Sequence, residues 1–155
     1  MNVFNYLKHC LLLKFKLTKP RIYLCGHTKE TEFRLEVKQK YSNKVTIVDP
    51  LEYQKLLGIV SHLDNKIWST SEKERIVKND MFLMNYSDIL VAYVNKITAG
   101  TMMEIFYTKH NLEKPVYLID PSQSLWNDVW LSQHYTYLFE NIENCFDQII
   151  KEYHL

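Results

Sequence analysis

DMFLMNYSDILVAYVNKITAGTMMEIFYTKHNLEKPVYLID, residues 80–120, is the stretch that decides the fold. Its two apolar runs, 89–94 and 116–119, have the composition of buried β-strands, and a helix is predicted to begin between them near Thr101. Strand, helix and strand in that order form a βαβ unit with parallel strands. Ligands of open α/β sheets bind outside the carboxyl ends of the strands, so the sequence predicts a ligand site around residues 95–104.

Strand and helix signals alternate through the rest of the chain. An aromatic loop near Trp68 is long enough to cover a ligand. The alternation predicts an α/β fold, a Rossmann-like or flavodoxin-like three-layer domain with a five-stranded, mainly parallel sheet. For the helix at 72–86, Ser71 and Glu74 occupy the positions of a capping box. Further strands are predicted at 21–25, 45–48 and 135–139, and further helices at 30–41, 51–63 and 142–153.

Length and composition indicate a single domain. The chain has 155 residues, of which 46% are hydrophobic and 24% are charged, enough for one core. We assign this domain to residues 20–155 and a helical extension to residues 1–19. The extension is expected to pack against the domain or a sister subunit, with a membrane surface as the alternative. It is predicted to be a basic amphipathic helix because apolar residues recur at helical spacing, namely Phe4, Leu7, Leu11 and Phe15.

Charge and cysteine content exclude several classes of protein. Lys and Arg number 19 against 18 for Asp and Glu, and a net charge of +1 gives no general attraction to nucleic acid or to anionic membranes. Cys10, Cys25 and Cys145 are odd in number and widely spaced, which is not the pattern of a metal site or a disulfide framework. We therefore expect reduced thiols, a cytoplasmic location and no metal.

Glu104 has two interpretations. Thr101 and Glu104 fit the pattern S/T-x-x-E, in which the carboxylate bonds the backbone amide of Thr101 as a helix capping box. Alternatively, a carboxylate at a helix N-terminus beside the ligand crevice is kept ionised by the helix dipole and can attack an electrophilic sugar carbon. Both interpretations are open at the level of the sequence.

Asp80 is predicted to face inward, because on the helix at 72–86 it shares an apolar face with Leu83 and Met84. Such an aspartate either bonds backbone amides or, when partly desolvated, keeps a proton that it can donate as a general acid. Asp88 precedes the strand at 89–94, at the opposite end from the expected site, and is interpreted as a turn or cap residue.

The first strand adds two candidates. Gly26 permits a tight backbone turn where the strand ends. Tyr23 either packs in the core or directs its phenol across the sheet toward Glu104. If it reaches Glu104, the strand and the helix meet at the predicted ligand site.

Taken together, these residues resemble the nucleoside 2-deoxyribosyltransferase family. The resemblance implies that Glu104 attacks the sugar C1′, that Asp80 protonates the departing base and that Tyr23 orients the nucleophile. The motifs that carry it are IYLCG at 22–26, DP at 49–50, Asp80 with SDILVAYV at 87–94, GTMMEI at 100–105, KPVYLID at 114–120 and, more loosely, YLFENIENCFDQII at 137–150. The resemblance also implies substrate contacts from Gly26, His27, Asp49, Thr98, Gly100 and Thr101.

Position 98 bears on the choice of substrate. Family members that use free nucleosides resemble DxGTxxE, in which the first acid binds the 5′ hydroxyl, but this chain has Thr98 there. A related branch, the 2′-deoxynucleoside 5′-monophosphate N-glycosidases, has a serine at that place. A hydroxyl can donate a hydrogen bond to a phosphate that a carboxylate would repel. The chain departs from that branch at residues 27–29, where His27 begins the segment HTK in place of a glycine-rich first loop, and from the family at Phe106, which stands where the family usually has a glycine.

The implied activity is cleavage or transfer at the N-glycosidic bond of a (2′-deoxy)nucleoside or its 5′-monophosphate, through a covalent glycosyl-glutamate intermediate and without a cofactor. The resemblance also implies a homo-oligomer, because sites of this family are often completed by a neighbouring subunit. One alternative is a phosphoribohydrolase of the cytokinin-releasing type, although the paired glycines expected before Gly100 and Thr101 are absent. The other is a catalytically silent nucleotide-binding module in which Glu104 is only a cap.

Overall fold

The computed structural model of the chain describes residues 19–58 and 68–155. The extension predicted at 1–19 lies outside these ranges except for Lys19, as does the end of the helix predicted at 51–63. The elements in chain order are β1 (Arg21–Gly26), α2 (Thr31–Tyr41), β2 (Thr46–Val48), α3 (Pro50–Leu56), α4 (Thr70–Tyr86), β3 (Ile89–Tyr93), α5 (Ala99–Phe106) followed by a π-helical turn η1 (Tyr107–Asn111), β4 (Val116–Ile119), a 3₁₀ turn η2 (Leu131–Gln133), β5 (Tyr137–Phe139) and α6 (Ile142–Tyr153). Among these helices, none combines the length and hydrophobicity that a bilayer span requires.

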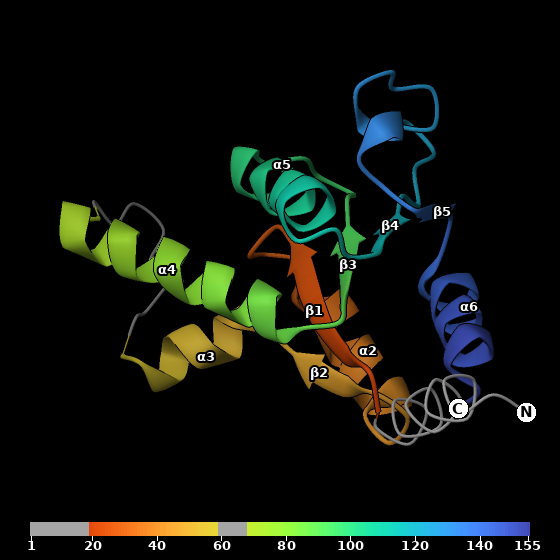
Figure 1. Cartoon of the computed structure of the whole chain (residues 1–155), viewed down its shortest axis with the longest axis horizontal. Helices are drawn as coiled ribbons and strands as arrows, with labels where there is room; N and C mark the ends of the chain where they lie inside the picture. Colours follow the sequence, from red (N-terminus) through yellow and green to blue (C-terminus); the bar gives the residue numbers. More distant parts are fainter. Residues whose placement is uncertain (1–18, 59–67) are drawn as a thin grey trace, which may run out of the picture.

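The strands form a five-stranded sheet in the order β2-β1-β3-β4-β5, and every neighbouring pair is parallel. This is the flavodoxin-like order, so the predicted fold is confirmed. Helices α2 and α6 cover one face of the sheet, and α4 and α5 cover the other (Figure 1). The strand order reverses between β1 and β3, and such a reversal opens a crevice at the carboxyl ends of the two strands.

Helix α4 begins two residues earlier than predicted. Ser69 is its N-cap, and the Glu72 carboxylate accepts a hydrogen bond from the Ser69 amide at 3.0 Å. The predicted capping pair, Ser71 and Glu74, is therefore wrong. The same S-x-x-E pattern occurs twice in succession here, and the earlier copy lengthens the helix.

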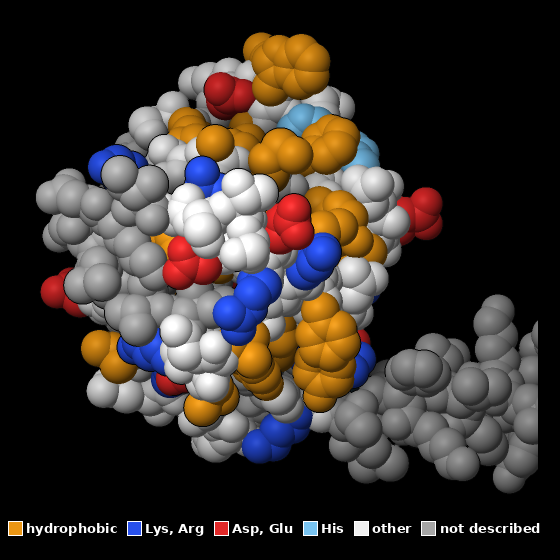
Figure 2. Space-filling model, turned by 90° about the vertical axis from the view of Figure 1, so that its left-hand side faces the viewer, with side chains coloured by type: hydrophobic (Ala, Val, Ile, Leu, Met, Phe, Trp, Pro, Cys, Tyr) orange, Lys and Arg blue, Asp and Glu red, His pale blue; other side chains and the backbone are white. Residues whose placement is uncertain are grey.

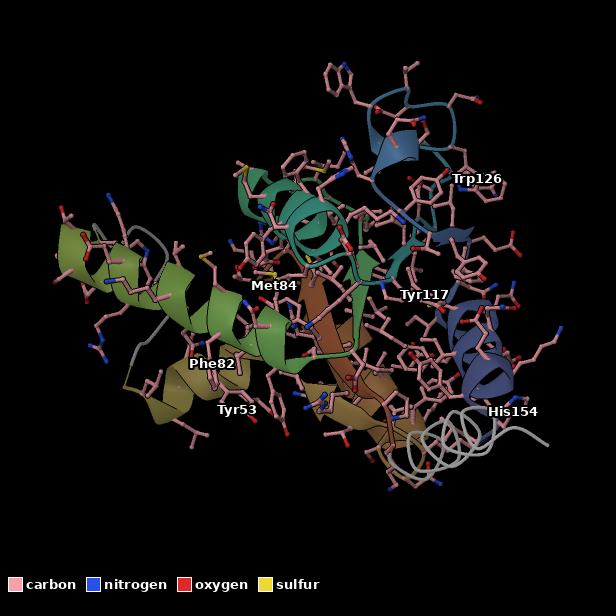
Figure 3. The ribbon with its side chains drawn as sticks, viewed as in Figure 1. Tyr53, Phe82, Met84, Tyr117, Trp126 and His154 are labelled. Atoms are coloured by element: carbon pink, nitrogen blue, oxygen red, sulfur yellow. The ribbon has the colours of Figure 1, made fainter. Side chains whose placement is uncertain are left out.

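Helices α3 and α4 carry exposed apolar side chains, and hydrophobic side chains lie at several places on the face that Figure 2 shows. Helix α4 extends beyond the sheet, and α3 packs beside it (Figure 1). The side chain of Phe82 on α4 is 67% exposed and that of Tyr53 on α3 is 39% exposed; the sticks of Figure 3 show both. The other exposed apolar residues of α4 are Val77, Met81 and Tyr86.

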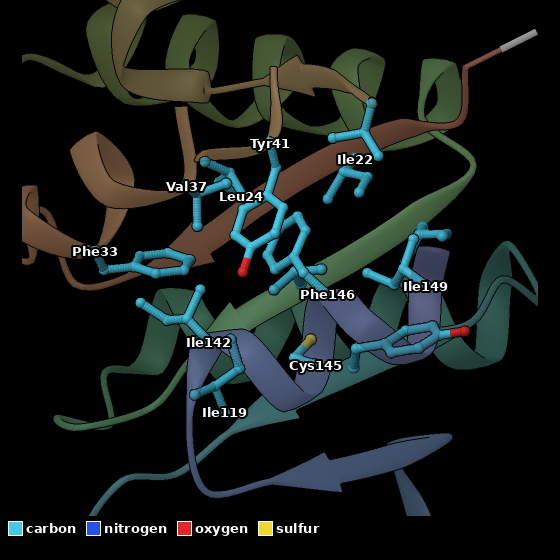
Figure 4. Packing of buried hydrophobic residues seen from close by; sticks show 14 residues of the cluster. Ile22, Leu24, Phe33, Val37, Tyr41, Ile119, Ile142, Cys145, Phe146 and Ile149 are labelled. Carbon is cyan, nitrogen blue, oxygen red and sulfur yellow. The ribbon is translucent and has the colours of Figure 1, made fainter. Parts of the chain in front are cut away.

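Hydrophobic side chains fill both faces of the sheet. Between the sheet and helices α2 and α6, the rings of Tyr41 and Phe146 stack with their centroids 4.2 Å apart (Figure 4). On the opposite face, α4 and α5 pack against Tyr23 and Cys25 of β1. Because successive side chains of a strand point to opposite faces, Tyr23 and Cys25, two residues apart, both point toward α5. Strand β1 therefore brings two polar groups to the underside of α5.

Candidate functional site

The crevice opens where β1 ends, at Gly26. This glycine has a φ of +150°, and a Cβ at its position would come within 3.0 Å of the Tyr93 carbonyl oxygen in β3. Glycine is the residue that tolerates both the backbone angle and the close approach. The need for glycine here was predicted, and its cause is the contact with β3 as well as the backbone conformation.

Helix α5 begins at Ala99, and Thr98 is its N-cap. The Thr98 hydroxyl accepts a hydrogen bond from the Thr101 amide at 3.2 Å and shares another with the Thr101 hydroxyl at 2.9 Å. The interpretation of Thr101 and Glu104 as a capping box is therefore wrong. Because the helix starts earlier than predicted, Glu104 lies in its second turn, past the amides that need a cap.

The Glu104 carboxylate lies against β1, with one neutral donor for each oxygen. The Tyr23 hydroxyl donates to Oε1 at 3.0 Å, and the Cys25 thiol lies 2.8 Å from Oε2. Tyr23 and Cys25 are both completely buried. The predicted contact between Tyr23 and Glu104 is thus confirmed, while the catalytic roles of the two residues remain predictions.

Asp80 is half-buried on the inner side of α4, as its helical spacing predicted. The Gln54 amide of α3 donates to Asp80 Oδ1 at 3.2 Å, and the amide of Asn79 lies 3.5 Å from the same oxygen. These partners are side chains, whereas the structural alternative for Asp80 required backbone amides. The carboxylate is therefore held in place without a cation in direct contact among the described residues.

Burial brings the pKa values of both carboxylates close to neutrality. Desolvation raises the pKa of Glu104 from 4.5 to about 7, although hydrogen bonds from Cys25 and Tyr23 oppose the rise. Desolvation also raises the pKa of Asp80 from 3.8 to about 6, and the hydrogen bond from Gln54 opposes it. Two carboxyl groups that titrate near neutral pH are suited to nucleophilic and acid–base chemistry.

Both carboxylates line one cavity of about 310 Å³ at the carboxyl end of the sheet. This volume is at the lower end of the range for small-molecule sites. The wall combines apolar side chains with a few polar groups, as ligand sites usually do. Trp68 belongs to this wall, whereas residues 59–67, the rest of the predicted aromatic loop, lie outside the described residues. The described residues of the wall are Gly26, Thr28, Arg34, Pro50, Leu51, Gln54, Trp68, Ile76, Asp80 and Glu104.

A larger cavity, of about 680 Å³, lies at the opposite end of the sheet beside Arg21 and Asp88. Arg21 and Asp88 are already paired with each other there, because Arg21 Nη2 lies 2.7 Å from Asp88 Oδ1. The smaller cavity holds two carboxylates with raised pKa values and lies at the carboxyl end of the strands, where ligands of this fold class bind. We therefore take the smaller cavity as the candidate site.

Arg34 reaches the candidate site from α2, although only 4% of the residue is exposed. Its guanidinium donates to the carbonyl oxygen of Leu24 at 3.0 Å and to that of Gly26 at 3.2 Å. Its Nε has no hydrogen-bond partner among the described residues. The positive charge lowers the pKa of both Glu104 and Asp80, so Arg34 opposes the effect of burial on the two carboxylates.

Asp49 was predicted to contact the substrate, but the structure places it behind the cavity wall. The residue is 2% exposed, and its carboxylate pairs with Arg34 at 2.8 Å and with Lys38 at 2.6 Å. It also caps α3 by accepting a hydrogen bond from the Leu51 amide. These contacts anchor Arg34, and Asp49 therefore reaches the site only through that arginine.

Four other predicted substrate contacts lie beside the cavity without lining it. The hydroxyls of Thr98 and Thr101 bond to each other at the start of α5, and Gly100 is exposed in the same turn. The His27 Nδ1 accepts a hydrogen bond from the Lys29 amide at 3.1 Å, which closes the loop after β1. Of the predicted substrate-binding residues, Gly26 alone belongs to the wall.

The site residues that were not predicted include Cys25, Arg34 and Gln54. Cys25 could have been found, because it is two residues from Tyr23 and points to the same face of a strand. Arg34 and Gln54 carry no such signal, since they reach the site only when α2 and α3 pack against the end of β1. In the described part of the chain, no three potential metal ligands gather at one place.

The fold has a counterpart among solved structures. A 2-deoxyribosyltransferase from Bacillus psychrosaccharolyticus superposes with a TM-score of 0.62 and 20% sequence identity, over 80% of this chain and 88% of that one. No family model matches the sequence, and no curated protein matches it. At 20% identity the likeness concerns the fold. The resemblance to nucleoside 2-deoxyribosyltransferases is thereby confirmed at the level of the fold.

Proposed function

We propose that the protein cleaves or transfers the N-glycosidic bond of a nucleoside or a nucleoside 5′-monophosphate. The observation that supports this is the position of the Glu104 carboxylate, held by Tyr23 and Cys25 in the same cavity as Asp80. The capping role, on which the silent-module alternative depended, belongs to Thr98. The shared fold with a 2-deoxyribosyltransferase gives the same chemistry further support.

In the first step, an oxygen of ionised Glu104 attacks the sugar C1′ and forms an ester bond. The bond between C1′ and the base nitrogen breaks, and its electron pair leaves with the base. Asp80 gives its proton to the departing base, so the base leaves neutral. In the second step, water or another base attacks C1′, the ester bond to Glu104 breaks, and the ionised Asp80 takes the proton of the attacking group, with net retention at the sugar carbon.

The two carboxyl groups share one proton near neutral pH. Between about pH 6 and about pH 7, the values of Asp80 and Glu104, the pair carries one proton. The productive form of this pair has the proton on Asp80 and the negative charge on Glu104. Activity should therefore follow a narrow bell-shaped curve around neutral pH.

The apolar side of the cavity suits a nucleobase. Leu51, Trp68 and Ile76 line it, and an aromatic ring such as that of Trp68 can stack on a planar base. The amide of Gln54, already bonded to Asp80, lies where a polar edge of the base would meet the proton donor. We propose that the base binds between this apolar wall and Asp80.

We further propose that the protein forms a homo-oligomer. Helix α4 exposes Val77, Phe82 and Tyr86, which are 56%, 67% and 45% exposed. Phe82 and Tyr86 are one helical turn apart and present neighbouring apolar side chains, and exposed apolar patches are typical of protein–protein interfaces. A second copy packed on α4 would lie close to Asp80, which is carried by the same helix.

The function is tested by incubating the protein with a panel of nucleosides and 5′-monophosphates, with and without a second base, and separating the products. Base release without an acceptor would indicate hydrolysis, and formation of a new nucleoside would indicate transfer. Glu104→Gln is the matched inactive control, because it keeps the shape of the side chain. Binding without turnover across the panel would contradict the proposal and favour a binding module.

A further inference from the structure

Cys25 is the closest neighbour of Glu104 for which the proposed reaction has no role. Its sulfur lies 2.8 Å from Glu104 Oε2 and 3.8 Å from the carbonyl oxygen of Thr101, and the residue is completely buried. The thiol therefore has two acceptors within reach, one on the carboxylate and one on the backbone of the same helix.

The charges around the thiol keep its proton in place. Desolvation raises the pKa of Cys25 well above its ordinary value, and the nearby charge of Glu104 raises it further. A protonated thiol can only donate to a carboxylate. Cys25 is thus a donor to Glu104 at neutral pH, and it is not a nucleophile itself.

The two donors to Glu104 differ in strength. The Tyr23 phenol on Oε1 is a strong donor, whereas a thiol is a weak one. A strong hydrogen bond withdraws electron density from the oxygen that accepts it. Oε2 is bonded by the weaker type of donor, and that donor has a second acceptor within reach, the Thr101 carbonyl, so Oε2 is the oxygen that can be released for attack.

We propose that Cys25 is a positioning residue that holds Glu104 Oε2 for attack and transfers its hydrogen bond to the Thr101 carbonyl as Oε2 bonds to C1′. This inference rests on the proposed function. Oε2 forms the new bond to C1′, the bond from C1′ to the base nitrogen breaks, and the electron pair leaves with the base, which takes the Asp80 proton. The thiol keeps its own proton throughout and changes only its acceptor.

The first test needs no substrate. The S–H stretching band lies in an infrared window with little other protein absorption, and its frequency reports the acceptor of the thiol. In the full chain, the Cys25 band should shift with a midpoint at about pH 7, where Glu104 ionises. The shift should disappear in Cys25→Ala and in Glu104→Gln. Cys145→Ala is the matched control, because Cys145 is a buried free thiol in the other core cluster and its loss should leave the shift unchanged.

The second test measures the rate. In an Asp80→Asn background with an activated leaving group, Glu104 is the group that titrates, so the rate should rise with pH to a plateau. Cys25→Ala should move the midpoint up by about one pH unit, since a donor to the carboxylate is lost. Cys25→Ser should move it down, because a hydroxyl is a stronger donor than a thiol. A residue that only fills space would lower the rate without moving the midpoint in opposite directions.

The outcomes separate this inference from the proposed function. If the protein turns over no substrate but its S–H band shifts with pH, the proposed function is contradicted and the contact between Cys25 and Glu104 is supported. An S–H band that does not respond to pH, or that responds equally in Glu104→Gln, overturns the inference even if the enzyme is active. If Cys25→Ala does not fold, the inference is still tested by the pH response of the wild-type S–H band and by the midpoint of the pH–rate curve of Cys25→Ser.

Discussion

A carboxylate lies beside each end of β1, Asp88 at the amino end and Glu104 at the carboxyl end. Their pKa values are shifted in opposite directions. At the amino end, burial would raise the pKa of Asp88, but hydrogen bonds and the positive charge of Arg21 outweigh it and lower the value. Arg21 donates its backbone amide at 2.8 Å and two guanidinium nitrogens at 3.0 and 2.7 Å. At the carboxyl end, the described residues that contact Glu104 directly are the neutral donors Tyr23 and Cys25, and its pKa rises to about 7.

The comparison shows what a reactive carboxylate needs. A cation in direct contact fixes the charge of Asp88 and makes the group chemically quiet. Neutral donors orient Glu104 but do not offset its desolvation, so the charge remains available to an electrophilic carbon. Arg34 acts on Glu104 through space, and its own hydrogen bonds go to backbone carbonyls and to Asp49.

The largest effect is expected from removing the charge at the carboxyl end. Glu104→Gln keeps the shape of the side chain but cannot form the ester, so kcat should fall by about four orders of magnitude or more. Steady-state assays on the best substrate of the panel, with circular dichroism to verify folding, would measure it. Glu74→Gln on the surface of α4 is the matched control and should be neutral. Near-normal turnover of Glu104→Gln would show that Glu104 is not the nucleophile.

A smaller effect is expected at Asp80. Asp80→Asn should lower the rate by about 10²- to 10⁴-fold on substrates whose base must be protonated, and much less on those with an activated leaving group. It should also abolish the fall in rate at high pH, since that fall reflects loss of the Asp80 proton. Asp147→Asn, an exposed change on α6, is the control. Equal losses on both substrate classes would mean that Asp80 only maintains structure.

The sequence predicted one end of this comparison better than the other. The alternation of β1 and the helical spacing of Asp80 were sufficient to bring Tyr23, Asp80 and Glu104 together, because periodicity determines which face a side chain takes. The predicted first residues of the helices were less accurate, because Thr98 and Thr101 are equally good N-cap residues by sequence alone. The geometry of the N-cap follows from how the loop leaves β3, which a local pattern does not contain.

Residues that depend on packing between elements were not predictable. Gln54 meets Asp80 because α3 lies beside α4, and Asp49 is withdrawn from the site because Arg34 and Lys38 of α2 pair with it. The pairing of Arg21 with Asp88 likewise links residues that are 67 positions apart. A single sequence gives no signal for any of these contacts.

The ionisation of Glu104 should also affect stability, with a sign opposite to that of an ordinary ion pair. Since its folded pKa is raised from 4.5 to about 7, the unfolded chain releases the proton first. The contribution of Glu104 to the free energy of unfolding is therefore fully present below about pH 4.5 and is lost as pH rises through about 7. Glu104→Gln lacks this loss and should be more stable than wild type above that value, by up to about 3 kcal/mol. Urea unfolding at acidic and alkaline pH would measure it; a difference independent of pH would contradict the raised pKa.

Adding a charge at the carboxyl end should change the choice of substrate. If the substrate carries a 5′-phosphate, wild type should prefer the monophosphate, and Thr98→Asp should erase that preference through repulsion and the loss of a hydrogen bond of about 1.5–3 kcal/mol, one to two decades in kcat/KM. Asp is itself a good N-cap, so α5 should still form. Thr98→Ser is the control, because it keeps the hydroxyl. A wild type that prefers the free nucleoside would defeat the phosphate interpretation.

The smallest effect is expected at the amino end of β1, where Asp88→Asn breaks the pair with Arg21. The folded pKa of Asp88 is lowered, so its contribution to stability is present at neutral pH and is lost as pH falls through the folded value, below 3.8. The two side chains are 38% and 36% exposed, and solvent screening limits the effect to about 1 kcal/mol. Asp88→Asn should thus be less stable than wild type near pH 7, the opposite of Glu104→Gln, with activity retained. Urea unfolding of both variants in one buffer series would show the contrast, and two changes of the same sign would mean that the partner's charge does not separate the two ends.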